Sequence, residues 1–164
     1  MIKRMFSVLL AALMTFSLFM TVSAEAATYD DGFIDQGGFV THEERIEDDG
    51  TYWFTIREEA KSKDEFIPSK NTITLTAKGR RGSTKDGSLY PDDSISYTVT
   101  VYNSNTDESV GSISATADGK TKSQKITVVA GQQYYLIVTC SPTLTNPSYL
   151  RLDGKITKNI TVIR

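Results

Sequence analysis

The stretch Ser94-Ile95-Ser96-Tyr97-Thr98-Val99-Thr100-Val101-Tyr102 decides the fold, because two kinds of side chain alternate along it without a break. Its odd-numbered positions are apolar or aromatic, and its even-numbered positions are Ser, Thr or Tyr. Successive side chains of an extended strand point to opposite faces of a sheet. β-branched residues are also favoured in strands. The stretch therefore predicts a β-strand with one face in a core and one in water.

The same period of two recurs along the chain from Phe39 onward. Residues 72–77 alternate Thr with Ile, Leu and Ala. No stretch after the first 24 residues keeps an apolar period of 3.6 over three turns, which is the signature of an amphipathic helix. Further strands are predicted at 39–46, 51–57, 112–117, 124–129, 133–140, 149–152 and 156–163.

Turn-forming residues separate these strands. Asp-Gly between two alternating runs is a strong hairpin signal, and it occurs at Asp118-Gly119 and at Asp153-Gly154. The predicted hairpins are 112–117 with 122–129, and 149–152 with 156–163.

Eight or nine short strands joined by polar turns predict an all-β fold, either an antiparallel β-sandwich or a jelly roll. Two segments are expected to lie outside the strands. Residues 58–66 are predicted to form at most one helical turn. Residues 78–91, rich in Gly, Ser and charge, are predicted to be a long mobile connection.

The first residues have the three-part layout of a secretory signal peptide. Lys3 and Arg4 precede an apolar run over 6–22, and small residues close it at Ala24, with Ala26 as the alternative cleavage site. An uncleaved anchor is the other interpretation, but Thr and Ser interrupt the run, and a spanning helix needs about 20 strongly apolar residues. We expect a secreted, extracellular protein. The expected organisation is a signal peptide at 1–24, a flexible arm at 25–37 and one domain at 38–164.

The charge balance bears on possible partners. The chain has 18 Lys and Arg against 20 Asp and Glu, a formal net charge of −2. Loss of Lys3 and Arg4 with the signal peptide makes the remainder more acidic. A mildly acidic protein attracts nucleic acid and anionic lipid weakly. We expect no nucleic-acid partner and no membrane association after cleavage.

One compact basic cluster, Lys78-Gly79-Arg80-Arg81-Gly82, stands against this acidic background. It fits an acidic polymer such as teichoic acid or a sulfated glycan. The simpler interpretation is a solvated loop that charge keeps soluble.

Cys140 is the single cysteine, so no internal disulfide can form and folding must rest on packing. It follows the apolar run 134–138, which favours a buried small hydrophobe. A reactive thiol would need a base nearby, and His42 is the only histidine. A thiol that pairs two molecules is the third interpretation.

Aromatic side chains are the leading candidates for a binding site. Alternation over 51–57 places Tyr52, Phe54 and Ile56 on one face and Trp53 on the other. A Trp on the outer face of a sheet offers a stacking surface for a sugar ring. The alternative is that a loop or the N-terminal arm covers it, since Trp is highly buried on average. The predicted ligand-binding residues are Trp53, Tyr102, Tyr135 and Tyr149.

Motifs for metals or catalysis are weak. His42-Glu43-Glu44-Arg45 lacks the second His of the zinc-protease pattern, since Ile46 occupies that place. Paired Asp residues at 30–31, 48–49 and 92–93 suit calcium or a glycosidase carboxylate pair, but Asp is also a common turn former. We expect no metal, no cofactor and no catalytic residue.

These observations predict a secreted, non-catalytic β-sandwich that binds a partner outside the cell. The favoured ligand is a cell-wall or environmental polysaccharide, contacted through surface aromatics. The alternative is a protein-binding module such as an inhibitor, effector or matrix component, which would use strand edges or residues 78–91. An enzyme that uses acidic residues is the third and least favoured class.

Overall fold

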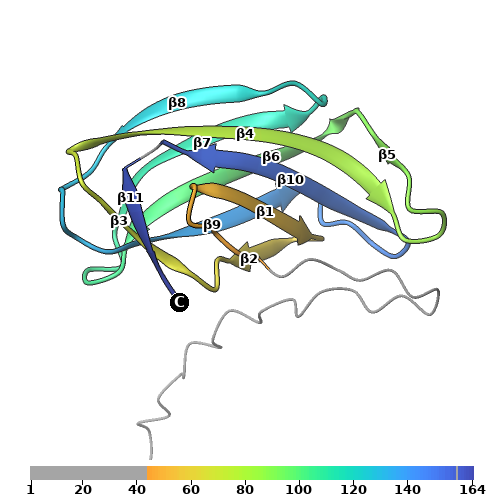
Figure 1. Ribbon diagram of the computed structural model, residues 1–164. Coiled ribbons are helices and arrows are strands. Elements are labelled where there is room, and N and C mark those ends of the chain that lie inside the picture. Colours follow the sequence, from red (N-terminus) through yellow and green to blue (C-terminus); the bar gives the residue numbers. More distant parts are fainter. Residues whose placement is uncertain (1–43, 158) are drawn as a thin grey trace, which may run out of the picture.

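The stretch that decides the fold lies in an interior strand of a six-stranded antiparallel sheet. In the computed structural model, which describes residues 44–157 and 159–164, β6 (Asp92–Asn103) lies between β7 (Ser109–Ala117) and β9 (Tyr134–Ser141) (Figure 1). Beyond β9 the sheet continues with β3 (Glu65–Pro68) and ends at β11 (Ile160–Ile163), while β7 is the opposite edge, and β2 (Glu59–Lys61) also pairs with β9.

A second, five-stranded sheet packs against the first. Its centre is β10 (Ser148–Ile156), which pairs with β1 (Thr51–Ile56) on one side and β4 (Thr72–Ser83) on the other. β8 (Lys122–Thr127) and the two-residue β5 (Leu89–Tyr90) both pair with β4. The predicted antiparallel β-sandwich is confirmed, and the described residues contain 11 strands where eight or nine were expected.

The core lies between the sheets and is built from every second residue. The odd-numbered side chains of the stretch from 94 to 102 all point inward, with exposures of at most 2 %. Tyr52, Phe54 and Ile56 of β1 are fully buried, as predicted. Burial of side chains of this size stabilises a fold by about 1.5–3 kcal/mol each. The burial of these alternate side chains is therefore the main source of stability.

No helix in the described part of the chain is long and apolar enough to cross a membrane.

The prediction of a mobile connection over 78–91 is wrong in its first half. β4 continues to Ser83 and keeps its pairing with β10 as far as Ser148 opposite Ser83. Charged residues persist here because they occupy the outward positions, as Lys78 and Arg80 do, while Gly79 faces the core. The helical turn predicted over 58–66 is also wrong, because Ala60 and Phe66 are buried in strands β2 and β3.

Both hairpin predictions are wrong. Asp118-Gly119 joins β7 in one sheet to β8 in the other, so that the two strands face each other across the core and pair with β6 and β4. Asp153-Gly154 lies inside β10. Gly154 is required there by close packing, since a Cβ would collide with the ring of Tyr52. The strand predicted at 39–46 lies mostly outside the described residues, and Ile46 forms only an isolated bridge to Tyr52.

A second glycine sets the distance between the sheets. The ring of Tyr97, from β6, lies on the backbone of Gly79 in β4, and a Cβ at Gly79 would lie 2.8 Å from Cδ1 of that ring. Tyr97 is 2 % exposed, so the ring has little space to move into. The absence of a side chain at position 79 lets a large aromatic ring fill the gap between the sheets.

We expect Gly79→Ala to lower the free energy of unfolding by about 1–3 kcal/mol, because the added methyl overpacks the core. Urea unfolding followed by fluorescence measures this. Ser123→Ala, an exposed change on β8, is the control. An unchanged midpoint for Gly79→Ala would contradict the packing of Tyr97 on Gly79.

Candidate functional site

Trp53 lies on the outer face of the five-stranded sheet and is partly exposed. Its register partner on β10 is Asp153, which in turn pairs with Lys78 on β4. In the next outward row, Thr55 of β1 stands opposite Arg151, and Arg151 opposite Arg80. We call this surface the Trp53 face. Thr55 itself is buried. The members of this surface are Trp53, Lys78, Arg80, Tyr149, Arg151 and Asp153.

The carboxylate of Asp153 orders the middle of the Trp53 face. One of its oxygens accepts a hydrogen bond from Arg80 Nη2 at 3.0 Å, and the other accepts one from Arg151 Nε at 2.9 Å. A carboxylate between two guanidinium groups holds both in fixed orientations. The cluster keeps a net positive charge, because one acid faces two bases.

Tyr149 occupies the far end of the same face. Its register partner is Gly82, and a Cβ at Gly82 would collide with the Tyr149 ring. The ring therefore lies flat across β4 and stays partly exposed. Burial raises the pKa of the Tyr149 hydroxyl, so this group is neutral at physiological pH.

Tyr102 and Tyr135 lie on the outer face of the other sheet. They are register partners on β6 and β9, and their rings stack with centroids 5.4 Å apart. Lys61 of β2, on the other side of β9, places its amine 3.7 Å from the centroid of Tyr135. Both sides of the Tyr135 ring are therefore occupied, and this residue is only 5 % exposed.

The hydroxyl of Tyr135 donates a hydrogen bond to Asp107 at 3.1 Å. Burial raises the pKa of Tyr135 to about 12, and the Asp107 carboxylate contributes in the same direction. These contacts give Tyr135 and Tyr102 a role in holding β2, β9 and β6 together. The four aromatics predicted as binding residues thus lie on opposite sides of the sandwich. Trp53 and Tyr149 share one face, and Tyr102 and Tyr135 share the other.

The basic residues of the cluster at 78–82 also point to two different sides of the sheet. Lys78 and Arg80 belong to the Trp53 face, whereas Arg81 points to the inward side at the end of the core. Its guanidinium bonds Asp92 at 2.9 Å and Ser148 Oγ at 2.7 Å. The hydroxyl of Ser94 and the Arg81 guanidinium lower the pKa of Asp92. Arg81 therefore closes the end of the sandwich.

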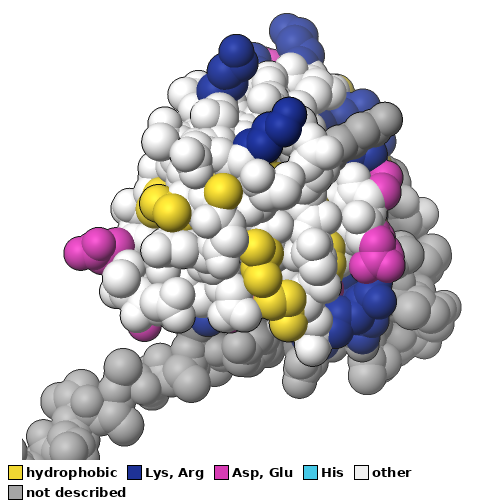
Figure 2. Space-filling view, turned by 60° about the vertical axis from the view of Figure 1, so that its left-hand side comes forward, with side chains coloured by type: hydrophobic (Ala, Val, Ile, Leu, Met, Phe, Trp, Pro, Cys, Tyr) yellow, Lys and Arg dark blue, Asp and Glu magenta, His cyan; other side chains and the backbone are white. Residues whose placement is uncertain are grey.

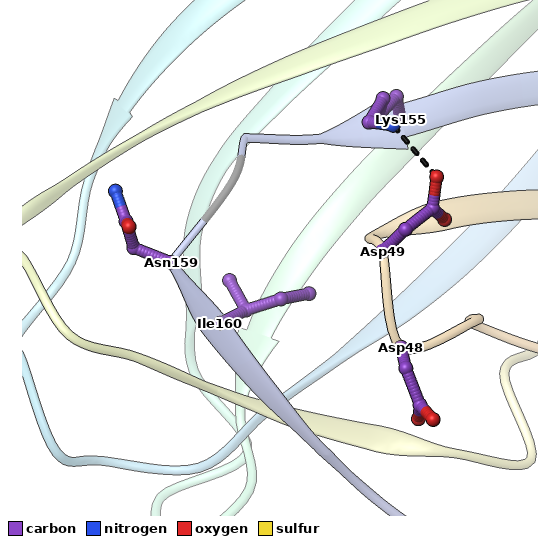
Figure 3. Close-up of a pocket in the computed structure, with 5 residues that line it drawn as sticks. All are labelled: Asp48, Asp49, Lys155, Asn159 and Ile160. Carbon is purple, nitrogen blue, oxygen red and sulfur yellow. Dashed lines mark hydrogen bonds and ion pairs between the residues drawn. The ribbon is translucent and has the colours of Figure 1, made fainter.

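A pocket of about 490 Å³ lies at the ends of β1, β10 and β11, where Asp48, Asp49, Lys155, Asn159 and Ile160 surround it (Figure 3). Asp49 accepts hydrogen bonds from Lys155 at 2.8 Å and from the Thr51 amide at 2.9 Å. The bond from Lys155 is the main reason that the pKa of Asp49 lies well below its usual range.

The two carboxylates at this pocket do not work as a pair. Figure 3 shows Asp49 turned toward Lys155 and Asp48 turned away from both, and Asp48 pairs with Arg164 at 3.1 Å. A glycosidase needs two carboxyl groups that converge on one bond. The pocket supplies ion pairs that join the β1 turn to β10 and to the last residue of the chain.

No three His, Cys, Asp or Glu side chains of residues 44–157 and 159–164 are grouped to hold a metal ion. His42 and Glu43 lie outside the described residues, as do Asp30 and Asp31. Large apolar side chains that are well exposed in the described ranges are Leu89, Tyr90 and Val129. Figure 2, which turns the end of the sandwich with β3 and β11 forward, shows one short apolar strip and a few small separate apolar patches there, with Lys and Arg along the upper rim and at the lower right.

No protein-family model and no curated protein matches this chain. The chemistry of its own surface is therefore the basis for assigning a function. Sequence reasoning predicted Trp53 and Tyr149 as binding residues and named Arg80 in the basic cluster, but it did not place Arg80, Arg151 and Asp153 beside the two aromatics. The signal for Arg80 was present, because the alternation that starts at Thr72 continues through Lys78.

Cys140 is 8 % exposed, and its thiol donates to the Arg57 carbonyl at 2.9 Å. Burial raises the pKa of the thiol to about 11. A thiol in this state is a weak nucleophile, because the reactive form is the thiolate. These properties favour the structural interpretation of Cys140 over a reactive one.

We expect Cys140 of the folded protein to react with Ellman's reagent at pH 8 at least about 100-fold more slowly than after unfolding in urea, because the thiolate fraction is far smaller. The absorbance of released thionitrobenzoate measures both rates. Equal rates in the two states would show an accessible thiol and would revive the pairing of two molecules.

Proposed function

We propose that this protein is a secreted, non-catalytic β-sandwich that binds an extracellular polysaccharide at the Trp53 face. The observation that carries the proposal is the partly exposed Trp53 on the outer face of the sheet. It lies opposite Asp153, which is bonded to Arg80 and Arg151. Sugar rings have an apolar face of C–H groups and a rim of hydroxyls. The Trp53 face offers an aromatic plane for the first and charged or polar groups for the second.

The shape of this face suits a polymer. Its members project from three adjacent strands, β1, β10 and β4, so they lie on one continuous outer face of the sheet. A small ligand is usually enclosed in a cavity that buries most of its surface. A chain of sugars can instead contact several outward rows in succession. The rows from Trp53 to Tyr149 provide an aromatic side chain at each end.

The protein-binding alternative has one specific observation in its favour. β7 pairs with β6 on one side and is the last strand of its sheet in the described part of the chain. Its sequence, Ser109–Ala117, carries no charged side chain. Natural proteins often place charge on such edges to prevent strand addition, and an uncharged edge is suited to bind an extended peptide. Chemical crosslinking that recovers one stoichiometric protein partner through β7 would favour this function.

We expect Trp53→Ala to weaken retention on an insoluble polysaccharide by about tenfold or more, equivalent to about 1.4 kcal/mol. The physical reason is loss of the stacking plane. A pull-down of the purified protein on cellulose and on isolated cell walls, with depletion curves for both proteins, measures the effect.

Tyr102→Leu is the matched control, since it removes an aromatic ring from the opposite face of the sandwich. It should leave retention unchanged. Loss of retention in Tyr102→Leu with full retention in Trp53→Ala would move the site to the other sheet. Equal retention by all three proteins would remove aromatic stacking as the basis of binding.

A further inference from the structure

We infer that the polysaccharide bound at the Trp53 face is anionic, and that Lys78, Arg80 and Arg151 recognise its carboxylate or sulfate groups. The inference rests on the proposed function and specifies its ligand. It follows from how the fold distributes charge, from the state of each cation and from the groups that accompany the cations.

The two outer faces of the sandwich differ in charge. Outward positions of the five-stranded sheet hold Lys78, Arg80, Lys125, Arg151 and Lys155, with Asp153 as the acid among them. The corresponding positions of the six-stranded sheet are mainly Ser and Thr, and the charged residues near them are Glu59, Lys61 and Glu65. The whole chain has a formal net charge of −2. The overall composition of the chain therefore does not account for the positive charge concentrated on this one face.

The ion pairs leave much of this positive charge available. Lys155 is paired with Asp49, but Lys78 makes no ion pair within the described ranges. Arg80 and Arg151 share the single carboxylate of Asp153. Each guanidinium has five N–H donors, and Arg80 and Arg151 each donate one hydrogen bond to Asp153. The Nε of Arg80 is buried and does not face a ligand. Donors therefore remain for an incoming anion.

The spacing suits repeated anionic groups. Arg80 and Arg151 are register partners on adjacent strands, so their backbones lie about 5 Å apart. Lys78 is one outward position along β4 from Arg80, about 7 Å away. All three cations lie within one Debye length of each other, about 10 Å at 0.1 M salt, and act together on a nearby charge. Guanidinium groups bind carboxylates in a bidentate manner and bind other oxyanions through the same planar fork.

The accompanying groups favour an acidic glycan over other polyanions. Asp153 lies at the centre of the Trp53 face, where it would repel a dense row of phosphates but can accept hydrogen bonds from sugar hydroxyls. The overall acidic charge gives little long-range attraction to nucleic acid. A polymer that carries hydroxyls and spaced anionic groups matches this mixture.

The test uses three immobilised probes with one backbone, namely dextran, carboxymethyl dextran and dextran sulfate. We expect the purified protein to bind one or both charged dextrans at least about tenfold more tightly than dextran, and to lose about tenfold or more in affinity when NaCl rises from about 50 to 500 mM. The carboxymethyl and sulfate arms identify which anionic group is preferred.

Variants assign the effect to the Trp53 face. Lys78→Gln with Arg80→Gln should lower affinity for the charged dextrans about tenfold or more. Arg80→Lys should lose part of the affinity for the charged dextrans, because an ammonium group lacks the planar fork of a guanidinium. Lys70→Gln, at an exposed position between β3 and β4, removes one positive charge away from the Trp53 face and should leave the affinity unchanged. If the double variant has a lowered unfolding midpoint, Lys78→Gln alone replaces it in the binding test. Lys78 forms no ion pair in the described residues, so its substitution breaks none of the ion pairs there.

The outcomes separate this inference from the proposed function. Equal binding of all three dextrans, with loss of binding in Trp53→Ala, would overturn the anionic ligand and retain the glycan. Failure to bind any insoluble polysaccharide or any dextran would overturn both. Tighter binding to a single-stranded DNA oligomer than to dextran sulfate would overturn the glycan in favour of nucleic acid. Equal losses in Lys70→Gln and Lys78→Gln would show non-specific attraction and would overturn the assigned site.

Discussion

The contact between the Tyr97 ring and the Gly79 backbone is the constraint on which the rest of the structure depends. It ties β6, an interior strand of one sheet, to β4, the strand that pairs with β10, β8 and β5 in the other. Gly79 is fixed against the core, and successive side chains of a strand point to opposite faces, so Lys78 and Arg80 point outward. One packing contact therefore determines both the separation of the sheets and the orientation of the basic residues on the far side.

The Trp53 face depends on pairing between strands that are distant in sequence. β1 and β10 are separated by most of the domain, yet their register places Trp53 beside Asp153. Register between β10 and β4 then places Arg151 beside Arg80. Asp153 joins the two guanidiniums by hydrogen bonds at 3.0 and 2.9 Å. A shift of one residue in either pairing would turn alternate side chains to the core and dismantle the cluster.

Aromatic residues have different surroundings on the two outer faces. Tyr135 is covered by Tyr102 and Lys61, and its hydroxyl is bonded to Asp107, so its ring joins neighbouring strands of the six-stranded sheet. Trp53 and Tyr149 stay partly exposed on a face that also carries charge. An aromatic ring on a sheet can stabilise cross-strand packing or meet a ligand. Its neighbours on adjacent strands decide between these uses.

The sequence by itself determined the all-β class and the inward and outward sides of the main strands, because a period of two is a local property that each strand carries alone. It also determined that Cys140 forms no internal disulfide and that Trp53 shares no side with Tyr52 and Phe54. Only the tertiary structure decided which strands pair, and it placed Gly154 inside β10 and divided the predicted aromatic set between two sheets. The physical reason is that a glycine suits a turn and a crowded core equally well. Its role, like the partner of Arg80, is set by residues far away in the chain.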